Sequence, residues 1–237
     1  MVVVPDGDGT ANATPALDRV YNMLEKALAP LEFLKSVNVR AQRRSVGVSF
    51  SNTDVTFDIV PAIARENGGY SIADRKLVGW IYTNPEAARM KATAANQASG
   101  VHLVRLIKVV KAWNLKIAKE AAIKDDRGGL IKPFKSFHLE VLCYGFKVAK
   151  PFNLREGVKG LFCYLRENWS QQLHPPGGGV SDSLYAYLHQ KGADEHPHDL
   201  GSLLNRAVLH ATEANLYEYL NPAYAHNCWS ELLGEVY

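Results

Sequence analysis

Two neighbouring runs of alternating apolar and polar residues constrain the fold of this chain more than any other feature. Residues 46–50 read Val-Gly-Val-Ser-Phe, and residues 55–60 read Val-Thr-Phe-Asp-Ile-Val. Alternation with a period of two is typical of β-strands that bury one face. Residues 51–54, Ser-Asn-Thr-Asp, have the composition of a turn. We therefore predict a β-hairpin over this region.

Asp58 is the residue that does not suit the second strand, because aspartate is depleted in β-strands. Alternation places Val55, Phe57 and Ile59 in the core and Asp58 on the opposite face. A polar residue on the solvent side of a half-exposed sheet explains Asp58 without any function. The alternative is a metal-binding carboxylate, because Mg²⁺ prefers oxygen ligands. The pattern alone leaves both interpretations open.

Helical periodicity dominates the second part of the chain. Residues 103–110 carry apolar side chains at the spacing of one helix face. Residues 1–100, in contrast, mix strand and helix patterns. We therefore predict an α+β fold with two domains, residues 1–100 and a helical lobe of residues 101–237.

Three residues of the helical part are candidates for binding. Lys111 lies outside the apolar stripe, where a lysine is usually solvated, although a lysine beside a cleft neutralises a triphosphate. Ser136 begins a predicted helix and suits the N-cap, and a helix N-terminus also binds anions. Phe137, beside it, is the kind of residue that more often packs in a core than stacks on a ligand.

Composition excludes several classes of protein. Hydrophobic residues make up 47% and charged residues 22%, as in an average soluble globular chain. The three cysteines lack the spacing of a disulfide framework or a zinc site, so a reducing cytoplasm fits best. No apolar run is long enough to span a membrane. The net charge of +3 does not by itself imply a nucleic-acid partner.

Three segments resemble a known family. The stretch from Asp54 to Ala62 resembles the strand with the third catalytic aspartate in the oligoadenylate synthetase and cyclic GMP–AMP synthase superfamily. The match is best with its bacterial branch, the CD-NTases of anti-phage signalling. Residues 103–114, ending Val-Lys-Ala-Trp-Asn, resemble the lysine-bearing helix of that family, and residues 136–140 resemble its Ser-Tyr/Phe-x-x-Glu helix start. The resemblance extends over nearly the whole chain.

The resemblance implies a DNA polymerase β-like nucleotidyltransferase lobe packed on an oligoadenylate synthetase-like helical lobe. Such enzymes make cyclic or linear oligonucleotide second messengers from nucleoside triphosphates such as ATP and GTP, with Mg²⁺ or Mn²⁺ as cofactor. Asp58 would match the metal-binding aspartate that helps to activate the attacking hydroxyl. Lys111 and Ser136 would match contacts to the donor phosphates, and Phe137 the aromatic that stacks on a base. Regulatory or effector proteins of the defence operon would be further partners.

The chain departs from the family pattern at its start. Relatives carry a Gly-Ser loop and an Asp-x-Asp metal pair before the strand that here reads Met-Val-Val-Val. Asp6 and Asp8 follow this strand in a Gly-rich turn, which explains them without a metal. One carboxylate cannot hold two divalent ions in place for the reaction. We therefore expect an N-terminally incomplete nucleotidyltransferase that is inactive or impaired as it stands.

Two other functions stay open. A degenerate family member would bind a nucleotide or a protein without catalysis, and Lys111 and Ser136 would still bind phosphate. Another polymerase β-like enzyme, which adds nucleotides to RNA, would require a more basic surface than a net charge of +3 provides. An unrelated helical interaction protein would carry Asp58, Lys111 and Ser136 in family order only by coincidence.

Overall fold

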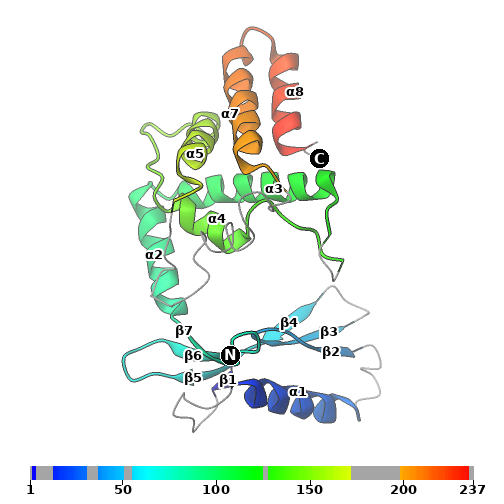
Figure 1. The fold of residues 1–237 in the computed structure, drawn as a ribbon. Helices are drawn as coiled ribbons and strands as arrows, with labels where there is room; N and C mark the ends of the chain where they lie inside the picture. Colours follow the sequence, from blue (N-terminus) through cyan, green and yellow to red (C-terminus); the bar gives the residue numbers. More distant parts are fainter. Residues whose placement is uncertain are drawn as a thin grey trace. The chain divides into compact units, whose positions relative to one another are not determined.

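The structure is a computed structural model, and it describes residues 2–3, 13–30, 37–50, 55–124, 128–171 and 198–234. The described part of the chain divides into two compact units, one up to Ala88 and one from Arg89 onward. We call them the sheet unit and the helical unit (Figure 1). The expected α+β class is confirmed. The domain boundary after residue 100 stays a prediction.

The sheet unit contains two small sheets and one helix. One sheet has the strand order β1-β5-β6-β7 and the other the order β2-β3-β4. Strand β1 runs parallel to β5, and the other described pairs are antiparallel. The elements are β1 (Val2–Val3), α1 (Thr14–Leu28), β2 (Val37–Ala41), β3 (Val46–Phe50), β4 (Thr56–Ile59), β5 (Pro61–Ala64), β6 (Tyr70–Asp74) and β7 (Gly79–Thr83).

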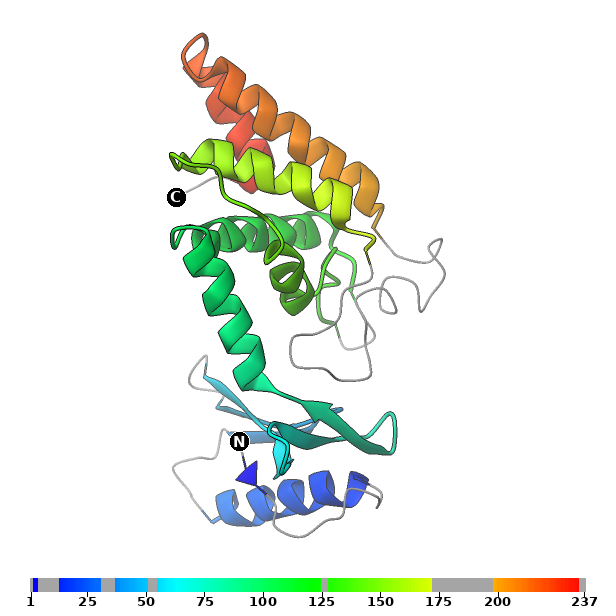
Figure 2. The same cartoon turned by 90° about the vertical axis from the view of Figure 1, so that its left-hand side faces the viewer.

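Helix α1 covers one face of these strands, as both views show (Figures 1 and 2). Leu17 of α1 is fully buried and packs in one cluster with Val46 of β3 and Ala73 of β6. The predicted hairpin is confirmed, because β3 and β4 pair antiparallel with Val48 opposite Phe57. The predicted turn between the two strands lies outside the described residues.

The prediction that Val55 and Phe57 lie in the core is wrong. Val55 is 48% exposed and Phe57 is 53% exposed, whereas Ile59 is half-buried. Strand β4 is an edge strand of its sheet, and α1 packs mainly on β2, β3, β5 and β6. Phe57 instead packs edge-on against Phe50, with ring centroids 6.1 Å apart. Alternation identifies the face of a strand but not whether another element covers that face.

The helical unit is built around α3, whose predicted apolar stripe is buried. Its core includes Leu106, Val110 and Trp113 of α3, together with Phe162 and Leu165 of α5. The elements are α2 (Pro85–Ala98), which begins in the sheet unit, α3 (Leu103–Ala121), α4 (Ser136–Cys143), α5 (Leu154–Asn168), α7 (Leu200–Tyr217) and α8 (Pro222–Leu233). In the described part of the chain, no helix combines the length and the apolar character that crossing a membrane requires.

Candidate functional site

Asp58 lies in the middle of β4 on the open face of the sheet, opposite the face that α1 covers. It stands directly across from Gly47 of β3, whereas the flanking pair Val48 and Phe57 points to the covered face. The side chain of Asp58 is exposed. The predicted face of Asp58 is therefore confirmed, and its carboxylate is accessible to a ligand from solvent.

Gln42 holds the Asp58 carboxylate on this open face. Its Nε2 donates a hydrogen bond to Asp58 Oδ1 at 2.9 Å. Its Oε1 accepts a hydrogen bond of 2.9 Å from the Ser45 hydroxyl. Gln42 and Ser45 also close the turn between β2 and β3, because the Gln42 N–H donates to the Ser45 carbonyl at 3.0 Å.

A second carboxylate of the sheet unit, Asp74, is fully buried. The Nε atoms of Arg43 and Arg44 donate to its two oxygens at 2.9 and 2.7 Å. The N–H groups of Lys76 and Leu77 donate to Oδ1 at 2.9 and 3.2 Å. Burial pushes the pKa of Asp74 upward, but these hydrogen bonds outweigh it and lower the pKa to about 2. Asp74 therefore anchors the β2–β3 turn.

Lys111 lies on α3 beside its buried stripe and forms an ion pair with Glu140 of α4. The two side chains are 34% and 30% exposed. An ion pair that water reaches this well contributes only about 0–1 kcal/mol to stability. A strongly anionic ligand can therefore draw the ammonium away from Glu140 at little cost.

Helix α4 begins at Ser136, and Lys135 occupies the N-cap position, where its side chain does not cap the helix. The predicted N-cap role of Ser136 is therefore wrong, because Ser136 already belongs to the first turn. Phe137 is 46% exposed, so it is not the core residue that its type favours. Both side chains belong to the first turn of a helix, where free backbone N–H groups favour an anion.

Asn114 fixes the chain just before α4. Its Nδ2 donates to the Phe134 carbonyl at 2.7 Å, and its Oδ1 accepts from the Phe134 N–H at 2.9 Å. Both residues are buried, and the ring of Trp113 packs against the Phe134 ring at a centroid distance of 6.4 Å. The Trp-Asn end of the lysine helix thus positions the start of α4 on α3.

Sequence reasoning missed three of these residues. Gln42 was not predicted, although Asn38, Arg40 and Gln42 continue one alternation, which places Gln42 on the face of Asp58. Glu140 was noted only as part of a motif, and its pairing with Lys111 joins two segments far apart in sequence. Asn114 was also part of a motif, and no local pattern indicates that it binds the backbone of Phe134.

The described residues also contain a cluster of possible metal ligands and a surface hollow, and neither is assigned as a functional site. His210 and Glu213 of α7 and Cys228 of α8 bring metal-ligand atoms within 4.8 Å of one another. Glu213 already accepts hydrogen bonds from the Tyr224 hydroxyl at 3.1 Å and the Cys228 thiol at 3.8 Å, so helix packing explains the cluster.

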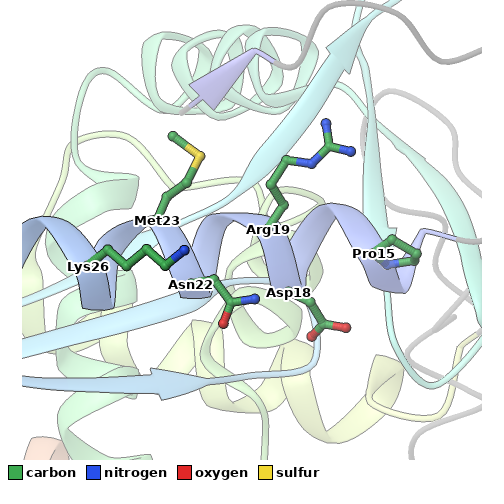
Figure 3. Close-up of a pocket in the computed structure, with 6 residues that line it drawn as sticks. All are labelled: Pro15, Asp18, Arg19, Asn22, Met23 and Lys26. Atoms are coloured by element: carbon green, nitrogen blue, oxygen red, sulfur yellow. The ribbon is translucent and has the colours of Figure 1, made fainter.

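The other feature is a hollow of about 460 Å³ on the outer side of α1 (Figure 3). Its lining is Pro15, Asp18, Arg19, Asn22, Met23 and Lys26. All of these side chains come from one helix and carry mixed charges, so they do not converge on one kind of ligand. The predicted Asp6 and Asp8 turn lies outside the described residues.

Comparison with known proteins supports a common origin with bacterial second-messenger enzymes. Residues 1–96, which include Asp58, match the model of the Second Messenger Oligonucleotide or Dinucleotide Synthetase domain. The chain is 31% identical over 146 residues to the cyclic AMP-AMP-AMP synthase of an Acinetobacter strain, a match that covers 61% of this chain and 38% of the relative. It is 25% identical over 181 residues to a Bacillus cereus protein named as a probable cyclic nucleotide synthase, covering 74% of this chain and 50% of the relative.

The chain therefore spans half or less of the length of these two relatives. Its fold is similar to that of CdnC from Escherichia coli MS115-1, solved with ATP, with a TM-score of 0.68 at 17% identity. That similarity covers 98% of this chain and 76% of CdnC. The same protein in complex with HORMA gives a TM-score of 0.66 at 18% identity. The domain match over residues 1–96, the two relatives and the shared fold agree, and together they support placing this chain in the bacterial CD-NTase family.

Proposed function

We propose that this chain is part of a metal-dependent nucleotidyltransferase that joins nucleoside triphosphates into cyclic or linear oligonucleotide second messengers. The observation that carries the proposal is the exposed carboxylate of Asp58, at mid-strand within the residues that match the synthetase domain. Both relatives are named as cyclic nucleotide synthases, which supports this reaction class. The structure of CdnC with ATP supports a nucleoside triphosphate as the substrate.

Asp58 suits the role of one ligand to a divalent ion. It is an exposed oxygen ligand, and Mg²⁺ or Mn²⁺ binds through carboxylates together with substrate phosphates and water. When bound, such ions neutralise the phosphates and activate the attacking hydroxyl. Asp58 alone does not supply enough ligands for two ions. We therefore expect synthesis to require an additional Asp-x-Asp pair, and a polypeptide of these 237 residues to be inactive or impaired.

The helical unit supplies residues for the donor nucleotide in this proposal. Lys111 exchanges Glu140 for a phosphate oxygen, and the Ser136 hydroxyl and the N-terminus of α4 bind phosphate. The exposed ring of Phe137 stacks on a base, an interaction that tolerates any base. A regulatory protein partner is supported by the complex of CdnC with HORMA.

A non-catalytic nucleotide-binding protein is the second candidate, because Lys111, Ser136 and Phe137 do not depend on the metal ligands. Binding is therefore measured before synthesis, with non-hydrolysable ATP and GTP analogues titrated into the full chain by calorimetry. Lys111→Ala should lower the affinity about tenfold, as expected when one charge-assisted contact to phosphate is lost. Lys119→Ala removes an exposed lysine from the same helix and should leave the affinity unchanged.

Glu140→Gln provides a test in the opposite direction. The substitution removes the carboxylate that competes with phosphate for Lys111, so the affinity should rise a few-fold. Equal affinities for the wild type, Lys111→Ala and Glu140→Gln would contradict the assignment of Lys111.

Synthesis is then assayed with Mg²⁺ or Mn²⁺ and all four radiolabelled nucleoside triphosphates. The full chain should bind nucleotide but give no more product than Asp58→Asn. Product well above that control would show that the expected inactivity is wrong. A chain that neither binds nor joins nucleotides would contradict both candidate functions.

A further inference from the structure

We propose that Gln42 is a positioning residue that fixes the orientation of the Asp58 carboxylate. The inference rests on the proposed metal-binding role of Asp58 and adds the residues that prepare it. A carboxylate rotates easily about its last side-chain bond, because that torsion has broad minima. A single well-placed donor therefore decides which oxygen faces the ligand.

The hydrogen bonds around Gln42 determine which way its amide points. The Asp58 carboxylate only accepts hydrogen bonds, so the group that faces it must be the Nε2 donor. The Ser45 hydroxyl donates to the Oε1 acceptor on the other side of the amide. Both partners favour the same orientation, and the reversed amide would lose the bond to Asp58.

Gly47 makes room for this arrangement. A Cβ atom built on Gly47 would lie 2.5 Å from Gln42 Nε2, and 3.6 Å from Asp58 Oδ1. The first distance is well inside van der Waals contact, so any other residue at position 47 would displace the Gln42 amide. The end of a flexible side chain moves at low cost, so the strand would survive the change.

The turn that carries Gln42 is itself held in place. Arg43 and Arg44, at the tip of the turn, bind the buried carboxylate of Asp74. The Arg75 N–H also donates to the Arg43 carbonyl at 3.0 Å. Ser45 is only 7% exposed. Gln42 therefore reaches Asp58 from a rigid support, which is what orientation of a metal ligand requires.

The two carboxylate oxygens of Asp58 therefore have different roles in this proposal. Oδ1 accepts the Gln42 amide, and no residue among those the structure describes donates to Oδ2. Oδ2 can therefore bind a divalent ion while Oδ1 accepts the hydrogen bond from Gln42. Residues that hold a metal ligand in this way typically contribute a factor of about 10–100 to metal affinity.

The contact is tested first, by NMR on the ¹⁵N-labelled full chain. Asp58→Asn should shift the side-chain amide signals of Gln42, because it replaces the charged acceptor. Asn38→Ala should leave them in place, since Asn38 is an exposed amide residue of β2 on the same face of the sheet as Asp58. Unshifted Gln42 signals in Asp58→Asn would overturn the proposal.

The positioning role is tested with Mn²⁺ alone, through its broadening of the backbone signals of positions 47 and 58. Gln42→Met and Gly47→Ala should each weaken Mn²⁺ binding about tenfold or more, with circular dichroism unchanged. Asn38→Ala is the control and should bind Mn²⁺ like the wild type. Wild-type binding by Gln42→Met and Gly47→Ala would overturn the positioning role.

The same two experiments also distinguish a failure of the proposed metal-binding role of Asp58 from a failure of the Gln42 contact. If Asp58→Asn shifts the Gln42 signals but leaves Mn²⁺ binding unchanged, the contact is real and Asp58 is not a metal ligand. That outcome overturns the metal-binding role of Asp58, and with it the positioning role of Gln42.

Discussion

At the scale of single residues, Asp58 and Asp74 belong to one unit but are suited to opposite tasks. Asp74 is fully buried and accepts hydrogen bonds from two arginines and two backbone N–H groups. A metal could bind it only by displacing those partners. Asp58 is exposed and accepts from Gln42 alone among the described residues, so a ligand can approach it without disrupting the fold.

Asp74 leads to a prediction about pH and stability. Its pKa is about 2 in the folded chain, below the usual value of 3.8. The folded state therefore gains stability from the ionised carboxylate above pH 4 and loses it as the pH falls towards 2. Asp74→Asn should lower the free energy of unfolding at pH 7 by about 2 kcal/mol. Urea unfolding should show this difference shrinking from pH 4 downward.

The matched control is Asp18→Asn, because Asp18 pairs with Arg75 but is 52% exposed. That change should alter stability by a fraction of a kcal/mol, about the median for surface pairs. A difference between wild type and Asp74→Asn that stays constant from pH 5 to pH 2 would contradict the role of the ionised Asp74.

At the scale of elements, the placement of α4 depends on Asn114. Asn114→Ala would leave the buried N–H and C=O of Phe134 without partners. Unsatisfied buried groups of this kind cost about 1–3 kcal/mol each, so the free energy of unfolding should fall by about 2–4 kcal/mol. Hydrogen exchange at the Phe134 amide should become faster in the same variant.

Asn153→Ala is the comparison for this prediction. Asn153 is an exposed N-cap residue of α5, whose side chain accepts from Arg155 and Glu156. Its loss should cost about 1 kcal/mol and leave the exchange of Phe134 unchanged. Equal effects of the two substitutions would show that Asn114 has no special role.

Sequence periodicity was enough to predict the β3–β4 hairpin, the helix α3 and the open face of Asp58. It failed for Phe57, because an edge strand can expose the same face that a central strand buries. It placed Ser136 at the N-cap, but the helix begins one residue earlier than that role requires. The contact between Gln42 and Asp58 joins the β2–β3 turn to β4, and the pattern of a single strand does not predict which residues from different elements meet. The site roles themselves stay predictions.

At the scale of the whole molecule, the described part of the chain has two hydrophobic clusters of unequal size, one in each unit. Among the described residues, the cluster in the sheet unit is built from Ala13, Leu17, Val46 and Ala73. The cluster of the helical unit is much larger and includes buried aromatic side chains such as Trp113 and Phe162. Burial of apolar area is the main source of stability, so the helical unit should be the more stable.

Hydrogen exchange of the full chain measures this difference directly. Local openings are easiest where few apolar contacts must break. The slowest amides should therefore lie in α3, α5 and α7, with protection in β2, β3 and β4 lower by roughly tenfold or more. Uniform protection across both units would indicate a single cooperative structure and contradict the prediction.

The close approach of Gly47 to Gln42 also has a consequence for how the sequence can evolve. The Cβ atom of any other residue at position 47 would lie 2.5 Å from Nε2 of Gln42, so the two positions are not independent. A descendant that keeps the Gln42 amide in contact with Asp58 is confined to glycine at position 47. A descendant that loses this glutamine is released from that restriction. The two positions should therefore vary together among homologous chains.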